Sequence, residues 1–169
     1  MKPILFNDIT RRDFIKTTAV AAAGVAVSKL GAAESKALNF NPDMEYRRLG
    51  KTGLMVSAVC LGGHWKRVDT VVSGSGGIDN PDFIKNRTDV VSRCIERGMN
   101  YIDACTSQEV LTYSKALKGR RDKMYLGFSW FEKEMRNPEY RTAEKLLDTL
   151  EKGMKQAELD YVDLWRITM

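Results

Sequence analysis

The sequence is poor in the residues that build metal centres and disulfide frameworks. Its 169 residues include a single histidine, His64, and three widely spaced cysteines, Cys60, Cys94 and Cys105. No Cys-x-x-Cys pair and no zinc-type spacing occurs, so we expect no structural zinc module. An odd cysteine count argues against a disulfide framework, although one bridge is compatible with an oxidising compartment.

Nucleotide-binding signatures and a basic surface are also missing. No Gly-x-Gly-x-x-Gly sequence occurs, and the glycine-rich stretch Ser73–Gly77 lacks the Gly-Lys-Ser/Thr end of a phosphate-binding loop. We interpret that stretch as a mobile loop, with a lid as the alternative. Arg120, Arg121 and Lys123 form a basic cluster without interleaved aromatic residues, so we interpret it as a solvated loop and expect no nucleic-acid partner.

The amino-terminal segment carries most of the chain's net charge. The whole sequence has a formal charge of +5, and residues 1–33 hold five basic and two acidic residues, which leaves +2 for the remainder. The apolar segment Thr17–Val27 is far shorter than the roughly 20 residues that cross a bilayer. We therefore expect no stable membrane anchor.

Thr10–Lys16 contains two adjacent arginines, Arg11 and Arg12, just before this apolar segment. The arrangement resembles the bacterial twin-arginine export signal, and small residues at Gly31–Ala33 suit a signal peptidase. The resemblance implies recognition by the twin-arginine translocation machinery and a periplasmic or otherwise exported location. The alternative is an amphipathic helix with a chance arginine pair. We expect a signal peptide over 1–33, a linker over 34–43 and a folded domain over 44–169.

From Met44 onward, strand-like and helix-like segments alternate. Gly50 and Gly53 bracket a turn that predicts a short hairpin. The third predicted helix should bury one face made of Ala143, Leu146, Leu147, Leu150 and Met154. The predicted strands are Val56–Gly62, Tyr101–Cys105, Met124–Trp130 and Tyr161–Ile167, and the helices are 83–95 (N-cap Asp82, end at Gly98), 108–117 and 142–157.

Alternation of this kind predicts an α/β fold with parallel strands and right-handed crossovers. Both an open doubly wound sheet and part of an eight-fold barrel fit the element order. The missing dinucleotide fingerprint counts against the open sheet. We therefore predict a (β/α)8 TIM-barrel type of fold of which about the first four β/α units are present.

Four sequence blocks, in order, resemble the aldo/keto reductase family. They are Tyr46–Ser57 with Leu61–Gly63, Gly98–Asp103, Ala116–Lys123 and Leu159–Leu164. The resemblance implies the barrel fold and NADPH-dependent carbonyl reduction at the carboxyl ends of the strands, with Gly62 and Gly63 near the cofactor. It also implies a catalytic tetrad in which an Asp and a Lys depress the pKa of a Tyr proton donor, while a His orients the carbonyl.

Only the aspartate of that tetrad, Asp103, is kept. Gln108 stands where the family has the tyrosine, Ser129 where it has the lysine and Thr168 where it has the histidine. A glutamine amide has no proton to donate near neutrality. Tyr113 would become the donor only through a local gap, because the block register puts it inside the second helix.

Other chemistry at the same strand ends stays open in the sequence. His64, Cys105 and Asp103 could ligate a metal or form a Cys–His pair, or they could be ordinary loop, packing and capping residues. Trp65 and Trp130 could line an apolar pocket or fill core. The resemblance assigns no metal.

An eight-fold barrel needs roughly 250 residues, and the segment after the signal is about half of that. We therefore expect the amino-terminal half of a longer protein or a truncated gene product, with a half-barrel that closes by dimerising as the alternative. The family draws most NADPH contacts from the second half, so we expect no tight cofactor binding here. The sequence favours an exported aldo/keto reductase-like protein with a degenerate tetrad, and whether it is an enzyme stays open. The alternative is a non-catalytic exported protein that binds a small molecule or a partner on the barrel scaffold.

Overall fold

A computed structural model describes residues 37–63 and 77–169. The chain divides into two compact units, Met1–Lys36 and Ala37–Met169, and the described residues belong to the second. His64, Trp65 and most of the Ser73–Gly77 loop lie outside the described residues, as does the signal segment. No helix among the described residues is long and apolar enough to cross a bilayer.

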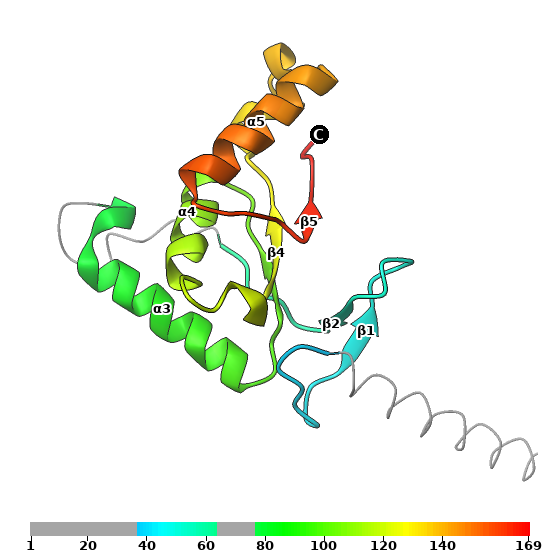
Figure 1. Ribbon diagram of the computed structural model, residues 1–169, viewed down its shortest axis with the longest axis vertical. Coiled ribbons are helices and arrows are strands. Elements are labelled where there is room, and N and C mark those ends of the chain that lie inside the picture. Colours follow the sequence, from blue (N-terminus) through cyan, green and yellow to red (C-terminus); the bar gives the residue numbers. More distant parts are fainter. Residues whose placement is uncertain (1–36, 64–76) are drawn as a thin grey trace, which may run out of the picture. The chain divides into compact units, whose positions relative to one another are not determined.

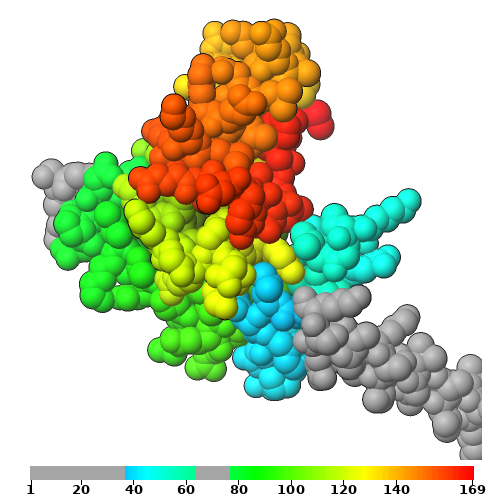
Figure 2. Space-filling model, in the orientation of Figure 1, coloured from blue at the N-terminus to red at the C-terminus, as the bar shows by residue number. Residues whose placement is uncertain are grey.

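The predicted hairpin is confirmed. Strand β1 (Tyr46–Arg48) pairs antiparallel with β2 (Met55–Ser57), and the Leu49 amide donates to the Leu54 carbonyl at 2.8 Å. Gly50 and Gly53 have φ of +53° and +79°, which only glycine adopts at low cost. The turn is exposed and stands out from the surrounding surface (Figure 2).

The prediction of one strand over Val56–Gly62 was wrong. Residues up to Ser57 belong to the hairpin, and the backbone then turns because the Ser57 amide donates to the Asn100 side chain at 2.8 Å. Leu61 alone rejoins a sheet, as an isolated parallel bridge to Ile102. Its amide and carbonyl bond to Tyr101 and Asp103 at 3.0 and 2.9 Å.

The main sheet is parallel, in the strand order β3-β4-β5. The register pairs Ile102 with Leu126 and Phe128 with Trp165. With the Leu61 bridge, four parallel segments follow one another in chain order, as the alternation predicted. They form a partial α/β structure, and the described residues do not close into a barrel. The strands are β3 (Tyr101–Asp103), β4 (Tyr125–Phe128) and β5 (Leu164–Trp165).

Three helices follow the predicted positions closely: α3 (Pro81–Glu96), α4 (Ser107–Ala116) and α5 (Ala143–Gln156). The N-cap of α3 is Asn80 rather than the predicted Asp82. The Asn80 side chain accepts the Asp82 and Phe83 amides at 2.9 and 3.2 Å, and proline at the first helical position favours this start. Gly98, with φ of +83°, follows the end of α3 as expected.

One face of the sheet packs against the helices (Figure 1). Ile102, Leu126 and Phe128 are fully buried there, together with Val91 of α3 and Val110 of α4. The predicted buried face of α5 is confirmed in part. Leu146 is buried, and Leu150 and Met154 pack partly buried against the core. Ala143 and Leu147 are exposed instead, and Thr149 and Gly153 are buried.

Gly153 allows α5 to approach the sheet closely. A β-carbon at this position would lie 2.5 Å from the Trp130 ring and 2.6 Å from Phe128. Trp130 is itself 7% exposed and lies 5.9 Å from the Phe128 ring, so most of its side chain fills core. Its remaining edge lines a surface hollow together with Tyr140 and Lys152.

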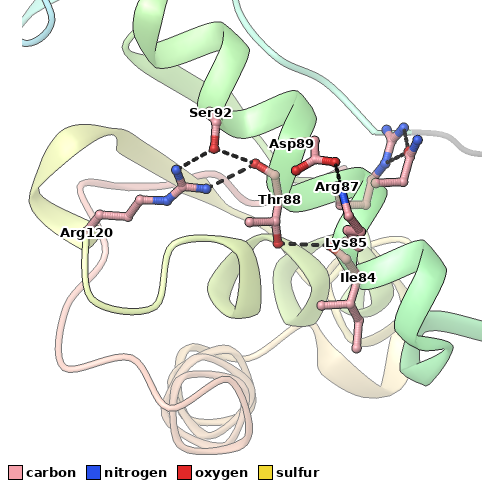
Figure 3. Close-up of polar contacts among 8 residues, drawn as sticks. Ile84, Lys85, Arg87, Thr88, Asp89, Ser92 and Arg120 are labelled. Carbon is pink, nitrogen blue, oxygen red and sulfur yellow. Dashed lines mark hydrogen bonds and ion pairs between the residues drawn. The ribbon is translucent and has the colours of Figure 1, made fainter.

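The interpretation of the basic cluster as a solvated loop was wrong for Arg120 and Arg121. Figure 3 shows Arg120 reaching across to α3, where its guanidinium donates to the Ser92 hydroxyl at 2.7 Å and the Thr88 carbonyl at 3.1 Å. Arg121 pairs with Asp163 at 2.6 Å, and both side chains are 17% exposed. These arginines connect elements of the fold, whereas Lys123 is exposed.

The segment before the hairpin is fastened to the amino-terminal side of the sheet. Ala37 bridges to Met55, and the side-chain Nδ2 of Asn39 donates to the backbone carbonyls of Met99 and Lys123 at 3.2 and 2.6 Å. The Tyr46 hydroxyl donates to the Gly98 carbonyl at 2.8 Å.

Candidate functional site

The carboxyl ends of parallel strands lie along one edge of a sheet, and the predicted site residues were drawn from that edge. Asp103 is the last residue of β3, Ser129 follows β4, and Thr168 lies shortly after β5. The structure brings Ser129 and Thr168 together, with their hydroxyl oxygens 3.0 Å apart. Asp103 takes part in a different set of contacts.

Asp103 forms an ion pair with Arg166 that the sequence did not reveal. The Arg166 Nη2 atom lies 2.9 Å from Asp103 Oδ1, and the two side chains are 43% and 35% exposed. The Tyr101 hydroxyl donates to the same carboxylate oxygen at 3.4 Å. A cation and a phenol therefore do stand beside Asp103, but they come from other positions than the tetrad pattern requires.

Burial raises the pKa of Tyr101 to about 12, and the nearby Asp103 charge adds to the shift, while Arg166 opposes it. This direction is opposite to the depressed pKa of a tuned proton donor. Tyr101 consequently stays protonated near neutrality and acts as a hydrogen-bond donor.

Glu134 lies beside Ser129 and Thr168 at the carboxyl ends of β4 and β5. Its side chain is 1% exposed and accepts hydrogen bonds from the Ser129 hydroxyl at 2.9 Å and from the amides of Trp130 and Thr168, each at 2.7 Å. Ser129 is fully buried. This cluster, which we call the Glu134 cluster, consists of Ser129, Trp130, Glu134 and Thr168. The cluster connects the end of β4 to the segment after β5. Its one hydroxyl donor to Glu134 is Ser129, at the position where the aldo/keto reductase family has its lysine.

Gln108 is exposed in the first turn of α4, so it is not gathered with Ser129 and Thr168. Its neighbour Glu109 is 2% exposed and accepts the Cys105 amide at 2.6 Å in a capping box with Thr106. Tyr113 lies inside α4, as the block register predicted. It is fully buried, and its hydroxyl donates to the Gly62 carbonyl.

Gly62 and Gly63 differ in their surroundings. A β-carbon on Gly63 would collide with Glu109, at 2.0 Å from its carboxyl carbon, whereas nothing lies within 4 Å of one built on Gly62. Gly63 therefore makes room for a structural side chain. A part in cofactor binding stays a prediction for both glycines.

The metal alternative depends on His64 and stays a prediction, because His64 lies outside the described residues. Among residues 37–63 and 77–169, no three His, Cys, Asp or Glu side chains are grouped to hold a metal ion, and His64 falls in the gap between these ranges. Cys60, Cys94 and Cys105 are free thiols.

Sequence reasoning missed Arg166 and Glu134 for different reasons. Arg166 had a visible signal, since a charged residue between the apolar residues Trp165 and Ile167 must face a partner or solvent. It lies two residues after Leu164, which pairs with Gly127, and Gly127 pairs with Asp103, so all of them face the same side. Glu134 had no such signal in the sequence, because it lies in an irregular connection between β4 and α5.

The sequence-family model that describes the twin-arginine translocation pathway signal sequence matches residues 8–28, which include Arg11 and Arg12. The chain therefore carries a twin-arginine signal that engages the translocation machinery and directs export. This confirms the predicted export route.

The structure is similar to two solved structures from Pseudomonas aeruginosa that are described as aldo-keto reductases. They are 20% and 22% identical to this chain, each with a TM-score of 0.51, and each match covers 71% of this chain and 45% of the other. The chain thus spans less than half the length of the structures it matches. At this identity the likeness defines a class by fold: the described residues fold like part of an aldo-keto reductase.

Proposed function

We propose that this chain is part of an exported, periplasmic aldo/keto reductase-like protein whose tetrad positions do not carry out ordinary carbonyl reduction. The observation behind the proposal is the Glu134 cluster. Ser129 and Thr168 stand where the aldo/keto reductase family has its catalytic lysine and histidine. Here the Ser129 hydroxyl and the Thr168 amide both donate to the buried Glu134 carboxylate. Asp103 is paired with Arg166 instead.

The strand-end residues also do not fit NADPH, a phosphate-rich anion. Phosphate sites are built from basic side chains and open backbone amides. Here the amides that follow β3 and β4 are already bonded to carboxylates: Cys105 to Glu109, Ser107 to Glu132 and Trp130 to Glu134. The connection after β4 also carries Lys133, Arg136 and Arg141, so its charges are mixed rather than basic. We therefore derive no reaction step through this cofactor.

The test is an assay of the complete exported protein. With NADPH and simple aldehydes that carry no hydroxyl groups, we expect no loss of NADPH absorbance above the rate without enzyme. Reduction that disappears in Asp103→Asn would contradict the proposal, because Asp103 would then serve a working tetrad-like site.

A second candidate is favoured by the Asp103–Arg166 pair. Its half-exposed side chains suit a non-catalytic protein that binds a small molecule at the strand ends. This candidate shares the first proposal's prediction of no turnover and adds ligand binding.

A further inference from the structure

A hollow of about 420 Å³ opens between the second half of α4 and the end of α5, and we call it the α4–α5 hollow. Its other walls are the turn after α4 and the connection from α5 to β5, which Figure 1 shows passing beside α4. Arg121 comes before β4 and Tyr161 comes before β5, so the hollow lies near the amino-terminal ends of these strands. It is therefore separate from the strand-end residues discussed above and goes beyond the proposed function.

The elements on both sides of this hollow belong to the described part of the chain. In an α/β fold with right-handed crossovers, a β/α unit that followed β5 would pack on the side of α5 that faces away from α4. Gln156 lines the hollow, and Leu147 precedes it by nine residues, which is about two and a half helical turns. Leu147 therefore points to the opposite side of α5, and its 49% exposure marks the side on which a further helix would pack. Such a helix would leave the α4–α5 hollow open.

The floor of the hollow is apolar and one wall is aromatic. Leu117 and Ala157 are buried residues of its lining. Tyr161 is 45% exposed, and the Arg121 guanidinium lies 4.2 Å from the centre of its ring, which holds the ring in place. A pocket of this size with an apolar floor and an exposed ring suits an organic ligand that carries an apolar or aromatic group.

The charges around the hollow favour a cation. Every cation of the lining already forms an ion pair with a carboxylate. These pairs are Lys115–Asp79, Lys118–Glu158 and Arg121–Asp163, with N–O distances of 2.5, 3.2 and 2.6 Å.

One carboxylate of the lining is left over. Asp160 is exposed and forms no ion pair with a described residue. In addition, α4 ends at Ala116 and α5 at Gln156, both beside the hollow, and the carboxyl-terminal end of a helix carries a partial negative charge. A positively charged ligand group is attracted by these charges, and an anion meets Asp160.

We propose that the α4–α5 hollow is a binding site for a small organic cation that carries an aromatic or other apolar group. The ammonium group of the ligand pairs with Asp160 near the two helix ends. Its apolar part packs on the floor formed by Leu117 and Ala157, beside the ring of Tyr161.

The test compares tryptamine with its alcohol analogue tryptophol, which share the indole ring and the two-carbon arm and differ in the charge of the terminal group. Binding to the complete exported protein is followed by NMR titration. We expect wild type to bind tryptamine about fivefold more tightly than tryptophol, because only the ammonium gains from Asp160 and the helix ends.

Two variants separate the charge of the site from its shape. Asp160→Asn changes an exposed residue and should bring the two affinities to within about twofold of each other by weakening tryptamine alone. Ser114→Phe places a ring in the hollow and should abolish binding of both compounds. The matched control is Asp43→Asn, which removes an exposed carboxylate that does not line the hollow and should change neither titration.

The inference is overturned if wild type does not bind tryptamine, or if it binds the two compounds equally. Tryptamine binding that is unchanged in both Asp160→Asn and Ser114→Phe would place the compound elsewhere and would overturn it as well. The outcome is independent of the aldehyde assay, which depends on Asp103 at the other end of the strands.

Discussion

Glu134 is the residue on which the geometry of the strand ends depends most. A carboxylate accepts several donors at once, and here two backbone amides and a hydroxyl converge on it in a water-poor setting. Removing a buried acceptor costs more than its hydrogen bonds contribute, since the donors are left unsatisfied.

Glu134→Gln should therefore destabilise the protein by about 2 kcal/mol. The amide nitrogen that replaces one carboxylate oxygen would face the amide of either Trp130 or Thr168, donor against donor. Urea unfolding followed by circular dichroism measures the change. Glu151→Gln, on the exposed side of α5, is the matched control and should shift the free energy of unfolding by less than about 0.5 kcal/mol. Equal stability of the two variants would contradict the structural role of Glu134.

At this scale, sequence reasoning placed Asp103 at a strand end correctly but could not find its partner. Alternation along a strand shows which residues share a face, yet the pairing of Asp103 with Arg166 needs the register of three strands. The Glu134 cluster depends on an irregular connection, for which no periodicity exists.

Among the elements, helices were more predictable than strands. The positions of α3, α4 and α5 follow from apolar spacing, caps and glycine stops, which are local signals. The N-cap of α3 is Asn80 instead of the predicted Asp82. Asn and Asp both cap helices well, and the proline that follows Asn80 favours Asn80, because proline suits the first helical position. The segment after the hairpin was misjudged because Ser57 bonds to Asn100, a residue 43 positions away.

The close packing of α5 on β4 gives a test at the same scale. Gly153→Ala should destabilise the protein by about 1–3 kcal/mol, because the added methyl group meets the rigid rings of Trp130 and Phe128. This outcome opposes helix propensity, which favours alanine by about 1 kcal/mol. Thermal and urea unfolding measure whether the free energy of unfolding falls or rises. Glu151→Ala, on the exposed side of the same helix, should be close to neutral, and a stabilised Gly153→Ala protein would show that α5 can move away from the sheet.

For the whole molecule, the export signal was readable from sequence because a receptor recognises it as a linear pattern. The parallel order of the strands was readable too, since connection rules leave few topologies for alternating elements.

Export should depend on the arginine pair. Arg11→Lys combined with Arg12→Lys should block export and leave uncleaved precursor in the cytoplasm, as cell fractionation and immunoblotting would show. The control exchanges the other amino-terminal arginine pair, Arg47→Lys with Arg48→Lys in β1, which should leave export unchanged. Normal periplasmic accumulation of the first double variant would refute the signal's role.

Ala37 and Asn39 are anchored to the hairpin and to the amino-terminal side of the main sheet, and this has a consequence for removal of the signal peptide. If cleavage follows Ala33, three residues separate the scissile bond from the first anchored one, and a fully extended chain of that length spans at most about 11 Å. A protease working on an already folded cargo must then dock almost against its surface, or wait until the first anchoring contacts release. Trimming of the leader would in that case report how firmly the segment Ala37–Asn39 is held.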